Sequence, residues 1–554
     1  MNSPSRTADL VLRHGHVLTV DPSFSSAQAI AVTDGRIVAV GANADMSALI
    51  GARTEVVDLD GRTVLPGIHD GHMHLAHWAE RLPEFSVDVT DATRLEQIQA
   101  AVAERVRSRP AGSWIRGHGW YEGRVADFAG ERFPTRHDID GVSPDHPVVL
   151  THFSSHGVWV NSAALRAAGI TATTPDPEGG QIVRDAAGEP TGWLLEAAAA
   201  LVTDLVPELT RAERAECIVA GMAEMNRRGV TSVTDPMVSA ELARCYQDLA
   251  REGGLSLRVA LLMHWTGHGR PNGGAEIGTA LSYAGFSTGL GDEWLRVAGA
   301  KLFIDGVPAL HTAWMSRPYA HDCLGSLVTD GDTDEARYDE VLDMIARLHA
   351  ARLQVQVHAT GDRACDAAVA GFVAAAEADP WPDARHVVIH GNLISPETAK
   401  MMAAHGICAN LNSLIKWTVA DKLESLYAGD ERAGYTMPMR TLLDAGVHVA
   451  DTSDAPIVDP DWRQAIECMV TRRAQGSGRV SGPEQCVTRE EALRAWTIEA
   501  AYQEHTEHLK GSIEVGKLAD LTVLEEDPLA VPADELHALT VARTYVGGRL
   551  VHSR

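Results

Sequence analysis

The sequence predicts an α/β fold: a (β/α)8 TIM barrel with a small β-sandwich domain built from both chain termini and a large insertion after strand 1. Three observations support this prediction. Short runs rich in Val, Ile and Ala recur through the middle of the chain, helix-like stretches lie between several of them, and both ends of the chain alternate β-like runs with turns. Buried parallel strands that alternate with helices are typical of α/β folds, and eight of them suggest a barrel.

Each predicted barrel strand is an apolar run with Gly, Asp or Asn near its C-terminal end. Stretches such as EARYDEVLDMIARLHAARL have the pattern of the intervening helices. The eight predicted strands are 64–74, 229–235, 257–265, 295–306, 353–361, 386–392, 406–412 and 446–456. The barrel domain is therefore predicted to span residues 64–510.

The two ends of the chain are predicted to form one small sheet domain, from residues 1–63 and 511–554. Asp-Gly turns in TDGRI and LDGRT separate β-branched runs, a pattern typical of β-hairpins. The C-terminal runs ADLTVLEEDP and ALTVARTYVGGRLVH look similar, so we expect them to pair with the N-terminal strands.

The spacing between the first two barrel strands is too long for a single helix. Roughly 150 residues intervene, whereas one helix normally links successive barrel strands. We therefore predict an insertion at about residues 80–225, rich in Trp, Gly and His, and we expect it to act as a lid over the barrel mouth.

The composition is that of a globular protein, with 45% hydrophobic and 22% charged residues. The formal net charge is −27, from 48 basic and 75 acidic side chains, which disfavours nucleic acid and anionic membranes as partners. Seven dispersed cysteines without close pairing indicate reduced thiols. We find no signal peptide and no long apolar span in the sequence, and we expect a cytoplasmic protein.

Metal-compatible side chains stand at the C-terminal ends of five predicted strands, the edge at which barrel active sites form. A single strand-end histidine is more often a core residue, so the joint arrangement carries the prediction of a metal site. The six residues are His72 and His74 on strand 1, Lys301 on strand 4, His358 on strand 5, His390 on strand 6 and Asp454 at the end of strand 8.

The alternation of side chains along a strand separates the histidines of GIHDGHMHL, and the nearby His77, into predicted ligands and residues outside the site. Residues two apart on a strand point to the same side, so His72 and His74 can reach one ion. His69 has the opposite parity and should face the surrounding helices, and His77 should lie in the following loop. Asp70 shares the parity of the ligands and is expected to support them.

Lys301 and Asp454 each have two interpretations. A lysine ammonium has no lone pair for a metal, but reaction with carbon dioxide would make Lys301 a carbamate whose two oxygens can bridge two cations. The alternative is an ion pair with Asp305 or another carboxylate. Asp454 can bind metal and move a proton, or it can cap a turn or helix.

Candidate substrate contacts are aromatic or imidazole side chains in the predicted insertion and loops. For each aromatic residue, plain packing is the alternative. Glu196 is mainly interpreted as a helix residue. The candidates are Trp120, Tyr121, His156, Trp159 and Trp314.

These motifs resemble the metal-dependent amidohydrolase superfamily. LPGIHDGHMH is similar to its strand-1 motif, and GSIEVGKLADLTVLEEDP is similar to its return into the β-sandwich. SSHGVWVNSAAL, PTGWLLE, KLFIDG, VQVHATGDRA and SDAP resemble the YtcJ-like, or amidohydrolase-3, group. The match covers nearly the whole chain.

The resemblance implies that all six strand-end residues are metal ligands, with Lys301 carboxylated and Asp454 also the proton shuttle. It implies one or two divalent ions, commonly zinc, and hydrolysis of an amide-type C–N bond, such as that of an N-acyl or N-formyl amine, by a metal-activated water. Three departures put the substrate in doubt: His69 replaces Ile or Val, SSHG lacks a preceding Asp, and HGN follows strand 6 where His-Ala-Gln is common.

Two other functions remain open. A hydrolytic deaminase of a heterocyclic ring could use the same scaffold, although Lys301 favours amide hydrolysis. A non-catalytic scaffold could keep the fold without the site, although all six expected groups are present. As partners we expect a small-molecule substrate and a second copy of the chain in a homodimer, but neither nucleic acid nor a membrane.

Overall fold

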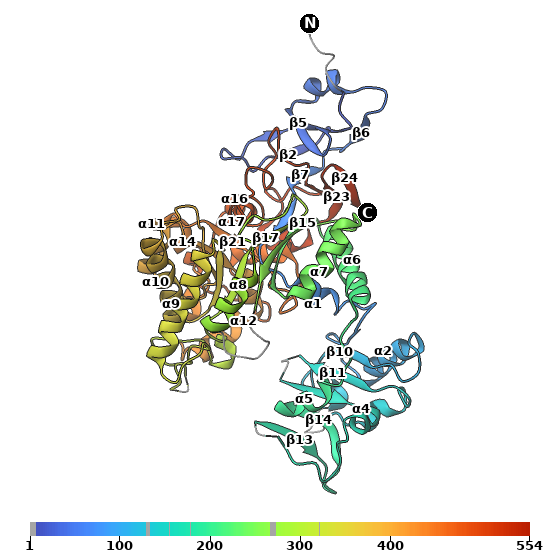
Figure 1. The fold of residues 1–554 in the computed structure, drawn as a ribbon. Helices are drawn as coiled ribbons and strands as arrows, with labels where there is room; N and C mark the ends of the chain where they lie inside the picture. The colour runs from blue at the N-terminus through green and yellow to red at the C-terminus, as the bar shows by residue number, and fades with distance from the viewer. Residues whose placement is uncertain (1–6, 129–132, 154–155, 178, 266–272, 321) are drawn as a thin grey trace. The chain divides into compact units, whose positions relative to one another are not determined.

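The computed structural model describes residues 7–128, 133–153, 156–177, 179–265, 273–320 and 322–554. The chain divides into two compact units, residues 1–75 with 222–554, and residues 76–221, and its path can be followed by colour in Figure 1. No helix in the described ranges is long and apolar enough to cross a membrane.

The first unit contains a sheet of eight parallel strands that forms a nearly closed barrel, which confirms the predicted barrel and its eight strands. The strands pair in the order β21-β20-β19-β18-β17-β16-β15-β8. Their bounds are β8 Ile68–Asp70, β15 Val230–Val238, β16 Arg258–Met263, β17 Leu295–Phe303, β18 Val355–Ala359, β19 Val387–His390, β20 Cys408–Leu411 and β21 Val449–Asp451.

Two backbone hydrogen bonds join the segments that follow the terminal strands of this sheet, β8 and β21. The amide of Asp454 donates to the carbonyl of His72 at 3.0 Å, and the amide of His74 donates to the carbonyl of Ala455 at 2.9 Å. These bonds place the segment after strand 1 directly beside the segment after strand 8.

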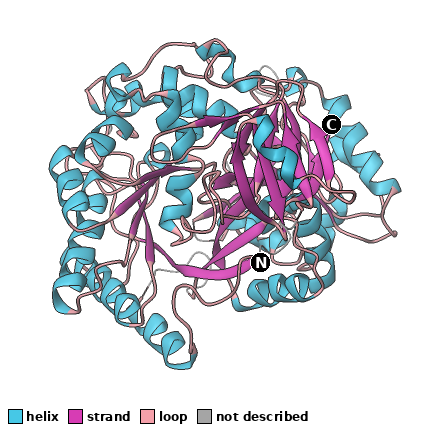
Figure 2. Cartoon of the chain, turned by 90° about the horizontal axis from the view of Figure 1, so that it is seen from above, coloured by secondary structure: helices cyan, strands magenta, loops and turns pink. Residues whose placement is uncertain are grey.

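The barrel helices follow the strands in sequence and lie around them (Figures 1 and 2). Several begin at a side-chain cap: Thr333 accepts from the amide of Ala336 at the start of α9, and Ser395 accepts from that of Thr398 at the start of α11. The helices here are α6 Arg211–Arg227, which begins in the second unit and ends in the first, α7 Ala240–Arg251, α8 Gly274–Tyr283, α9 Asp334–Ala350, α10 Asp362–Ala378, α11 Pro396–Ala404, α12 Ser413–Leu426, α13 Arg432–Tyr435, α14 Met439–Ala445, α15 Trp462–Thr471, α16 Arg489–Ala495 and α17 Ile498–Gln503.

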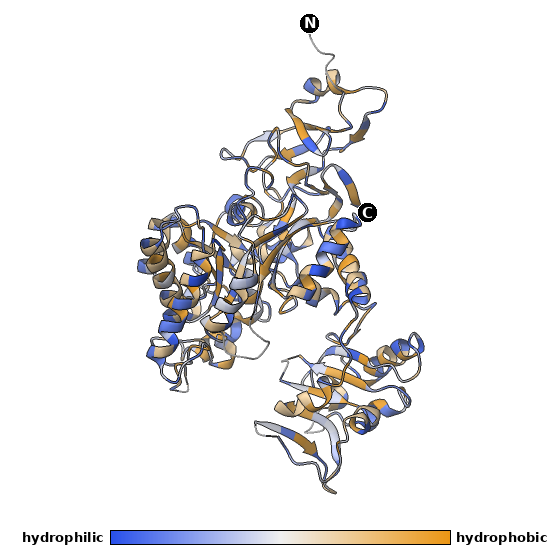
Figure 3. Cartoon of the chain, in the orientation of Figure 1, coloured by the Kyte–Doolittle hydropathy of each residue, from blue (hydrophilic) through white to orange (hydrophobic). Residues whose placement is uncertain are grey.

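Hydrophobic residues are frequent on the strands, and the helices carry both hydrophilic and hydrophobic residues (Figure 3). The strand β18, for example, is buried along its whole length, while α9 buries residues such as Met344 and Leu348 and exposes polar ones. This division is expected when helices cover a parallel sheet.

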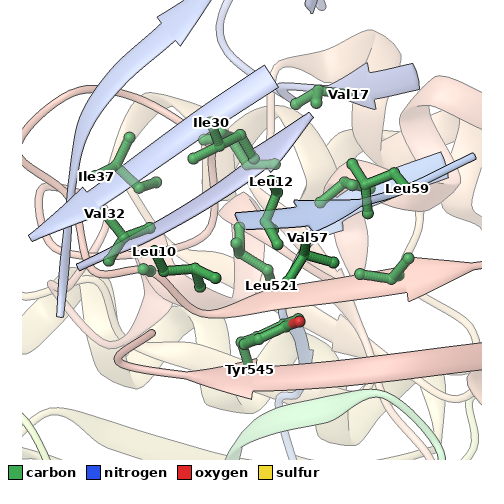
Figure 4. Close-up of a cluster of buried hydrophobic side chains, with 14 of the residues drawn as sticks. Leu10, Leu12, Val17, Ile30, Val32, Ile37, Val57, Leu59, Leu521 and Tyr545 are labelled. Atoms are coloured by element: carbon green, nitrogen blue, oxygen red, sulfur yellow. The ribbon is translucent and has the colours of Figure 1, made fainter. Parts of the chain in front are cut away.

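Strands from both ends of the chain share a six-stranded sheet, in the order β24-β23-β22-β7-β2-β3, and four N-terminal strands form a second sheet, in the order β5-β4-β1-β6. Buried residues of both sheets, among them Leu12, Ile30, Leu521 and Tyr545, pack into one apolar core (Figure 4). The strands are β1 Leu10–Arg13, β2 His16–Leu18, β3 Ser26–Ala27, β4 Ala29–Thr33, β5 Arg36–Gly41, β6 Glu55–Asp58, β7 Thr63–Pro66, β22 Leu521–Leu524, β23 Val541–Val546 and β24 Arg549–Ser553.

One of the two predicted Asp-Gly hairpins is present. At TDGRI the strands β4 and β5 pair antiparallel, with Asp34 and Gly35 both at positive φ, as a tight hairpin turn requires. The hairpin predicted at LDGRT is wrong, because β6 pairs with β1 in one sheet and β7 pairs with β2 and β22 in the other.

The predicted first barrel strand, residues 64–74, is also divided between two sheets. Residues Thr63–Pro66 form β7 of the six-stranded sheet, and only Ile68–Asp70 form β8 of the barrel. Gly67 separates them, and a Cβ atom there would lie 2.1 Å from Oγ1 of Thr231. His72 and His74 therefore follow the strand instead of lying within it.

The second unit is built on a mixed six-stranded sheet in the order β13-β14-β12-β11-β10-β9. Its core contains Trp120, Trp159 and Phe128. The elements here are α1 Leu75–Ala79, which begins at the end of the first unit, β9 Val87–Asp88, α2 Leu95–Arg107, β10 Ile115–Trp120, α3 His137–Asp140, β11 Val148–His152, β12 Gly157–Val160, α4 Ser162–Ala167, β13 Gly180–Arg184, β14 Pro190–Glu196 and α5 Ala197–Thr203.

Candidate metal centre

Three of the predicted ligands, His72, His390 and Asp454, form one compact buried cluster. Each offers a nitrogen or oxygen atom, and these atoms lie within 4.8 Å of one another. His390 is the last residue of β19, and the other two follow β8 and β21. The C-terminal edge of the barrel thus brings together groups that are far apart in the sequence.

His74 joins this cluster through the carboxylate of Asp454. Nε2 of His74 lies 3.4 Å from Oδ1 of Asp454, and Nε2 of His72 lies 3.8 Å from the same oxygen. The two imidazoles meet edge to face, with ring centroids 5.6 Å apart. Although they lie beyond the strand, both histidines of the His-x-His motif therefore approach the same carboxylate oxygen.

Lys301, on β17, extends into the same centre. Its Nζ lies 3.1 Å from Nε2 of His72 and 4.7 Å from the centroid of the Phe303 ring. The side chain is 1% exposed, and burial lowers the pKa of this lysine to about 7, although the charge of Asp454 opposes the shift. Burial in a site of low polarity thus makes the neutral amine accessible near neutral pH.

The alternative pairing of Lys301 with Asp305 is not found among the described residues. The carboxylate of Asp305 instead accepts hydrogen bonds from the backbone amides of Trp314, Thr360 and Gly361, at 2.8 to 3.0 Å. Asp305 therefore fastens the loop after β17 to the end of β18.

His358, on β18, has one ring nitrogen held by a backbone carbonyl. Its Nε2 lies 3.0 Å from the carbonyl oxygen of Gly306, and its ring centroid lies 4.4 Å from that of His390. Because a carbonyl only accepts hydrogen bonds, Nε2 must carry the proton, which leaves the lone pair of the neutral ring on Nδ1.

His390 is held at the opposite ring nitrogen from His358. Its Nδ1 lies 2.6 Å from the side-chain oxygen of Asn412, so Nδ1 donates and the lone pair lies on Nε2. The residue ends β19 with a φ of 72°, and Gly391 follows at 51°. This left-handed turn is rare for a residue other than glycine.

Burial keeps the imidazoles of His72, His358 and His390 neutral. It places the pKa values of His72 and His358 well below the usual range and lowers that of His390 to about 4. Burial alone would raise the pKa of Asp454, but the hydrogen bond with His74 and the charges of His390 and Lys301 hold it below its usual value. These three imidazoles are therefore neutral nitrogen donors near one carboxylate.

Asp70 supports the segment that carries His72. Its Oδ1 accepts from the Thr452 hydroxyl at 2.5 Å, from the Ser453 amide at 3.2 Å and from the His72 amide at 3.4 Å. Burial raises the pKa of Asp70 to about 6. The roles of Asn412, Thr452 and Gly306 could not be predicted from the sequence, because no local pattern indicates which residues will lie beside a histidine in the fold.

The donor set fits a divalent metal ion. Nδ1 of His72 and Oδ2 of Asp70 are buried and have no hydrogen-bond partner among the described residues, and a buried polar atom without a partner is costly. Neutral imidazole nitrogens and a carboxylate oxygen are ligands that suit zinc and related ions.

Neither His69 nor His77 belongs to the group of possible metal ligands found among the described residues. Nε2 of His69 pairs with Oε1 of Glu504 at 3.0 Å, which agrees with its exclusion from the ligand set. His77 lies in α1, not in a loop as predicted.

Trp314 is the one predicted substrate contact in the first unit. It is buried, and the guanidinium of Arg363 lies 3.9 Å from its ring centroid. The loop that carries it contacts the end of β18, because a Cβ on Gly361 would lie 2.0 Å from the Trp314 carbonyl.

The remaining candidates belong to the second unit, and their contacts there differ. Trp120 and Trp159 are fully buried, and their indole nitrogens donate to the carbonyls of Leu150 and Thr135, which favours packing. Tyr121 is 37% exposed. Nδ1 of His156 lies 3.0 Å from the Glu196 carboxylate, and residues 154–155 of SSHG lie outside the described residues.

Comparison with known proteins agrees with this geometry. Residues 55–552 match the model of the amidohydrolase family. The chain is 30% identical to YtcJ of Bacillus subtilis, with 98% of each chain covered, and 30% identical to N-substituted formamide deformylase of Arthrobacter pascens, with 99% of this chain and 98% of that protein covered.

Solved structures show the same fold. A metal-dependent hydrolase from Pyrococcus furiosus superposes with a TM-score of 0.75 at 24% identity, over 94% of this chain and 99% of that one. The family match spans most of the chain and includes all six strand-end residues. The protein is therefore a member of the amidohydrolase family.

Proposed function

We propose that the protein is a metal-dependent hydrolase that cleaves an amide-type C–N bond, as in an N-acyl or N-formyl amine. The observation that carries the proposal is the buried cluster of His72, His390 and Asp454, which Lys301 contacts. Membership of the amidohydrolase family supports hydrolysis, and the similarity to a formamide deformylase supports this class of bond.

The proposed ligands of one or two divalent ions, with zinc the first choice, are the six strand-end residues. His358 would bind through Nδ1 and His390 through Nε2, because Gly306 and Asn412 occupy their other nitrogens. When bound, such an ion would lower the pKa of a water molecule and polarise a substrate carbonyl.

Lys301 would take part as a carbamate. Its neutral amine can attack carbon dioxide, which forms an N–C bond and releases a proton, and the product is an anion with two oxygen ligands. The low pKa of this buried lysine supports the reaction, because an ammonium has no lone pair with which to attack. The charge of the carbamate would also balance the cations beside it.

Asp454 is the proposed proton carrier. Its carboxylate is ionised at neutral pH and reaches both His72 and His74. It can accept a proton from the attacking water and deliver it to the nitrogen of the leaving amine, which must gain a proton to depart.

The proposal includes the domain limits expected from the sequence: a β-sandwich domain of residues 1–63 and 511–554, and a barrel domain of residues 64–510 with its insertion at about 80–225. The six-stranded sheet shared by both chain ends supports a common domain for them. Of the candidate substrate contacts, the exposed ring of Tyr121 suits the role best.

The two alternatives make different demands on the site. A deaminase with one ion does not need the lysine, so the contact between Lys301 and His72 favours amide hydrolysis. A non-catalytic scaffold does not need a complete ligand set, yet all six residues are present and five of them are at least nine-tenths buried.

The decisive experiment measures metal content and substrate turnover on one preparation. The full-length protein is purified without chelator, its metals are quantified, and it is assayed against N-formyl, N-acyl, carbamate and ester compounds together with aminated heterocycles. We expect one or two equivalents of a divalent metal and turnover of an amide. Absence of zinc, manganese and iron would overturn the enzyme proposal, and release of ammonia from a ring compound alone would favour the deaminase.

A further inference from the structure

A second buried polar cluster lies beside the metal centre but does not belong to it. It consists of His69, Thr234, Glu504 and Lys510, which we call the Glu504 clamp. Oε1 of Glu504 lies 3.0 Å from Nε2 of His69 and accepts from the Thr234 hydroxyl at 2.6 Å, and Oε2 of Glu504 lies 3.1 Å from Nζ of Lys510. All four residues are less than a tenth exposed.

Burial of the Glu504 clamp costs more free energy than a purely structural contact requires. Glu504 is ionised, because the charges of His69 and Lys510 outweigh the effect of burial and lower its pKa, and Nδ1 of His69 has no hydrogen-bond partner among the described residues. Apolar side chains of similar size would fill this space without the cost of removing charges from water. The arrangement therefore points to a positional role.

Two connections lead from Glu504 to the ligand-bearing segment. The first is His69 itself, which lies on β8 directly before Asp70 and three residues before His72. The second is Thr234: its hydroxyl donates to Glu504, while its carbonyl accepts from the amide of Met73, the residue between His72 and His74. Glu504 thus contacts β8 on one side and, through one residue of β15, the backbone between the two histidines.

The segment that contains Glu504 is itself fixed in place. Glu504 follows α17, and the carbonyl of the preceding Gln503 accepts from the Gln354 side chain at 2.6 Å. Further along, Asp520 forms a buried two-point ion pair with Arg258, and its carbonyl accepts from the amide of Gly67, just before β8. Residues 504–520 therefore hold β8 at its start and at its centre.

We propose that Glu504 is a positioning residue for the metal centre: through His69 and Thr234 it sets the position of residues 70–74, and so the metal affinity of His72 and His74. This inference rests on the proposed metal-dependent function. Residues 504–520 would then contribute to metal binding, although they supply none of the proposed ligands.

The test is metal affinity, measured by competition between the full-length apoprotein and a chelator for zinc, and by the visible absorption spectrum of bound cobalt. Glu504→Leu should lower zinc affinity about 10- to 100-fold, the range found for residues that orient metal ligands, and should change the cobalt spectrum. Glu504→Gln keeps an oxygen for Thr234 and His69 and should lose much less. Measurements are made well below the unfolding temperature of each apoprotein.

The matched control is Glu467→Leu. Glu467, on α15, is also a mostly buried carboxylate paired with a histidine, His537, at 2.6 Å. Among the described residues its hydrogen bonds are made with α15 and with His537, and not with β8 or β15. It should lower the unfolding temperature and leave zinc affinity and the cobalt spectrum unchanged.

Zinc affinity of Glu504→Leu within twofold of the wild type, with an unchanged cobalt spectrum, would overturn the proposal and leave the clamp as a stabilising contact. If Glu504→Leu does not fold, Thr234→Val is measured instead, because it removes only the hydroxyl that binds Glu504. A loss of zinc affinity of about threefold or more would support the positioning role of Glu504, and no loss would refute it. A wild-type protein that binds no metal would instead refute the proposed function.

Discussion

Nζ of Lys301 lies 3.1 Å from Nε2 of His72, although 229 residues separate them in the chain. Both groups are buried and basic, so they cannot both be protonated at this distance without strong repulsion. Burial lowers the pKa of Lys301 to about 7, and burial together with the charge of Lys301 places the pKa of His72 well below its usual range. The pair presents lone pairs rather than protons, which is what carbamate formation and metal binding require.

If the proposed function holds, replacement of Lys301 by Ala should reduce kcat/KM for the substrate at least 100-fold, because the proposed carbamate cannot form. Acetate or propionate should restore part of the activity by occupying the vacated space as a carboxylate. The measurement is kcat/KM as a function of acid concentration. Full activity of Lys301→Ala without added acid would show that the site works without the lysine.

Asn412→Ala should lower zinc affinity about 10- to 100-fold, because the Asn412 oxygen holds Nδ1 of His390 and so directs Nε2 toward the centre. Asn412→Asp keeps an oxygen acceptor and should bind zinc much more tightly than Asn412→Ala. Chelator competition measures both affinities. Equal affinities for wild type and Asn412→Ala would mean that His390 is positioned by its backbone alone.

A buried histidine pair should make the protein sensitive to acid. Nδ1 of His386 accepts from the Val355 amide, its Nε2 binds Nδ1 of His349 at 2.8 Å, and Nε2 of His349 donates to the Asp379 carbonyl. Burial, with the positive charges of His349 and His505, lowers the pKa of His386 from 6.5 to about 3.

The sign of the pH dependence follows from proton uptake. Between pH 6.5 and about 3 the unfolded chain holds a proton at His386 that the folded protein does not, so stability is fully present above pH 6.5 and falls as the pH drops. This residue contributes a slope of about 1.4 kcal/mol per pH unit to the free energy of unfolding. The free energy of unfolding of His386→Gln, measured by urea unfolding at several pH values, should depend on pH less steeply by that amount.

Phe372→Leu is the control for this experiment. The Phe372 ring stacks on His386, with centroids 4.8 Å apart, but it does not titrate. The variant should be less stable at every pH and keep the slope of the wild type. An unchanged slope in His386→Gln would show that His386 does not titrate in this range.

The aromatic candidates of the second unit should separate into packing and contact residues. Trp159→Ala should lower the free energy of unfolding by about 3–5 kcal/mol, the usual cost of removing a buried tryptophan. Tyr121→Ala should change it by no more than about 0.5 kcal/mol and should raise KM if the ring touches substrate. Urea unfolding and steady-state kinetics on both variants check this, and an unchanged KM in Tyr121→Ala would remove it from the substrate contacts.

The sequence by itself determined the barrel and its candidate site residues. Apolar runs that end near Gly, Asp or Asn are a local property of parallel strands, and strand ends define the functional edge of a barrel. Residues such as Lys301 and His358 could therefore be predicted as candidates for the site from their places on strands.

Tertiary structure alone decided how these residues are held. It divided the predicted first strand at Gly67, where Thr231 leaves no room for a side chain, and it chose the ring nitrogen that each histidine presents, through Gly306 and Asn412. It also paired His69 with Glu504 across 435 residues. The physical reason is common to all three: hydrogen-bond partners and steric limits come from segments that are distant in the sequence, and local patterns carry no information about which of them will meet.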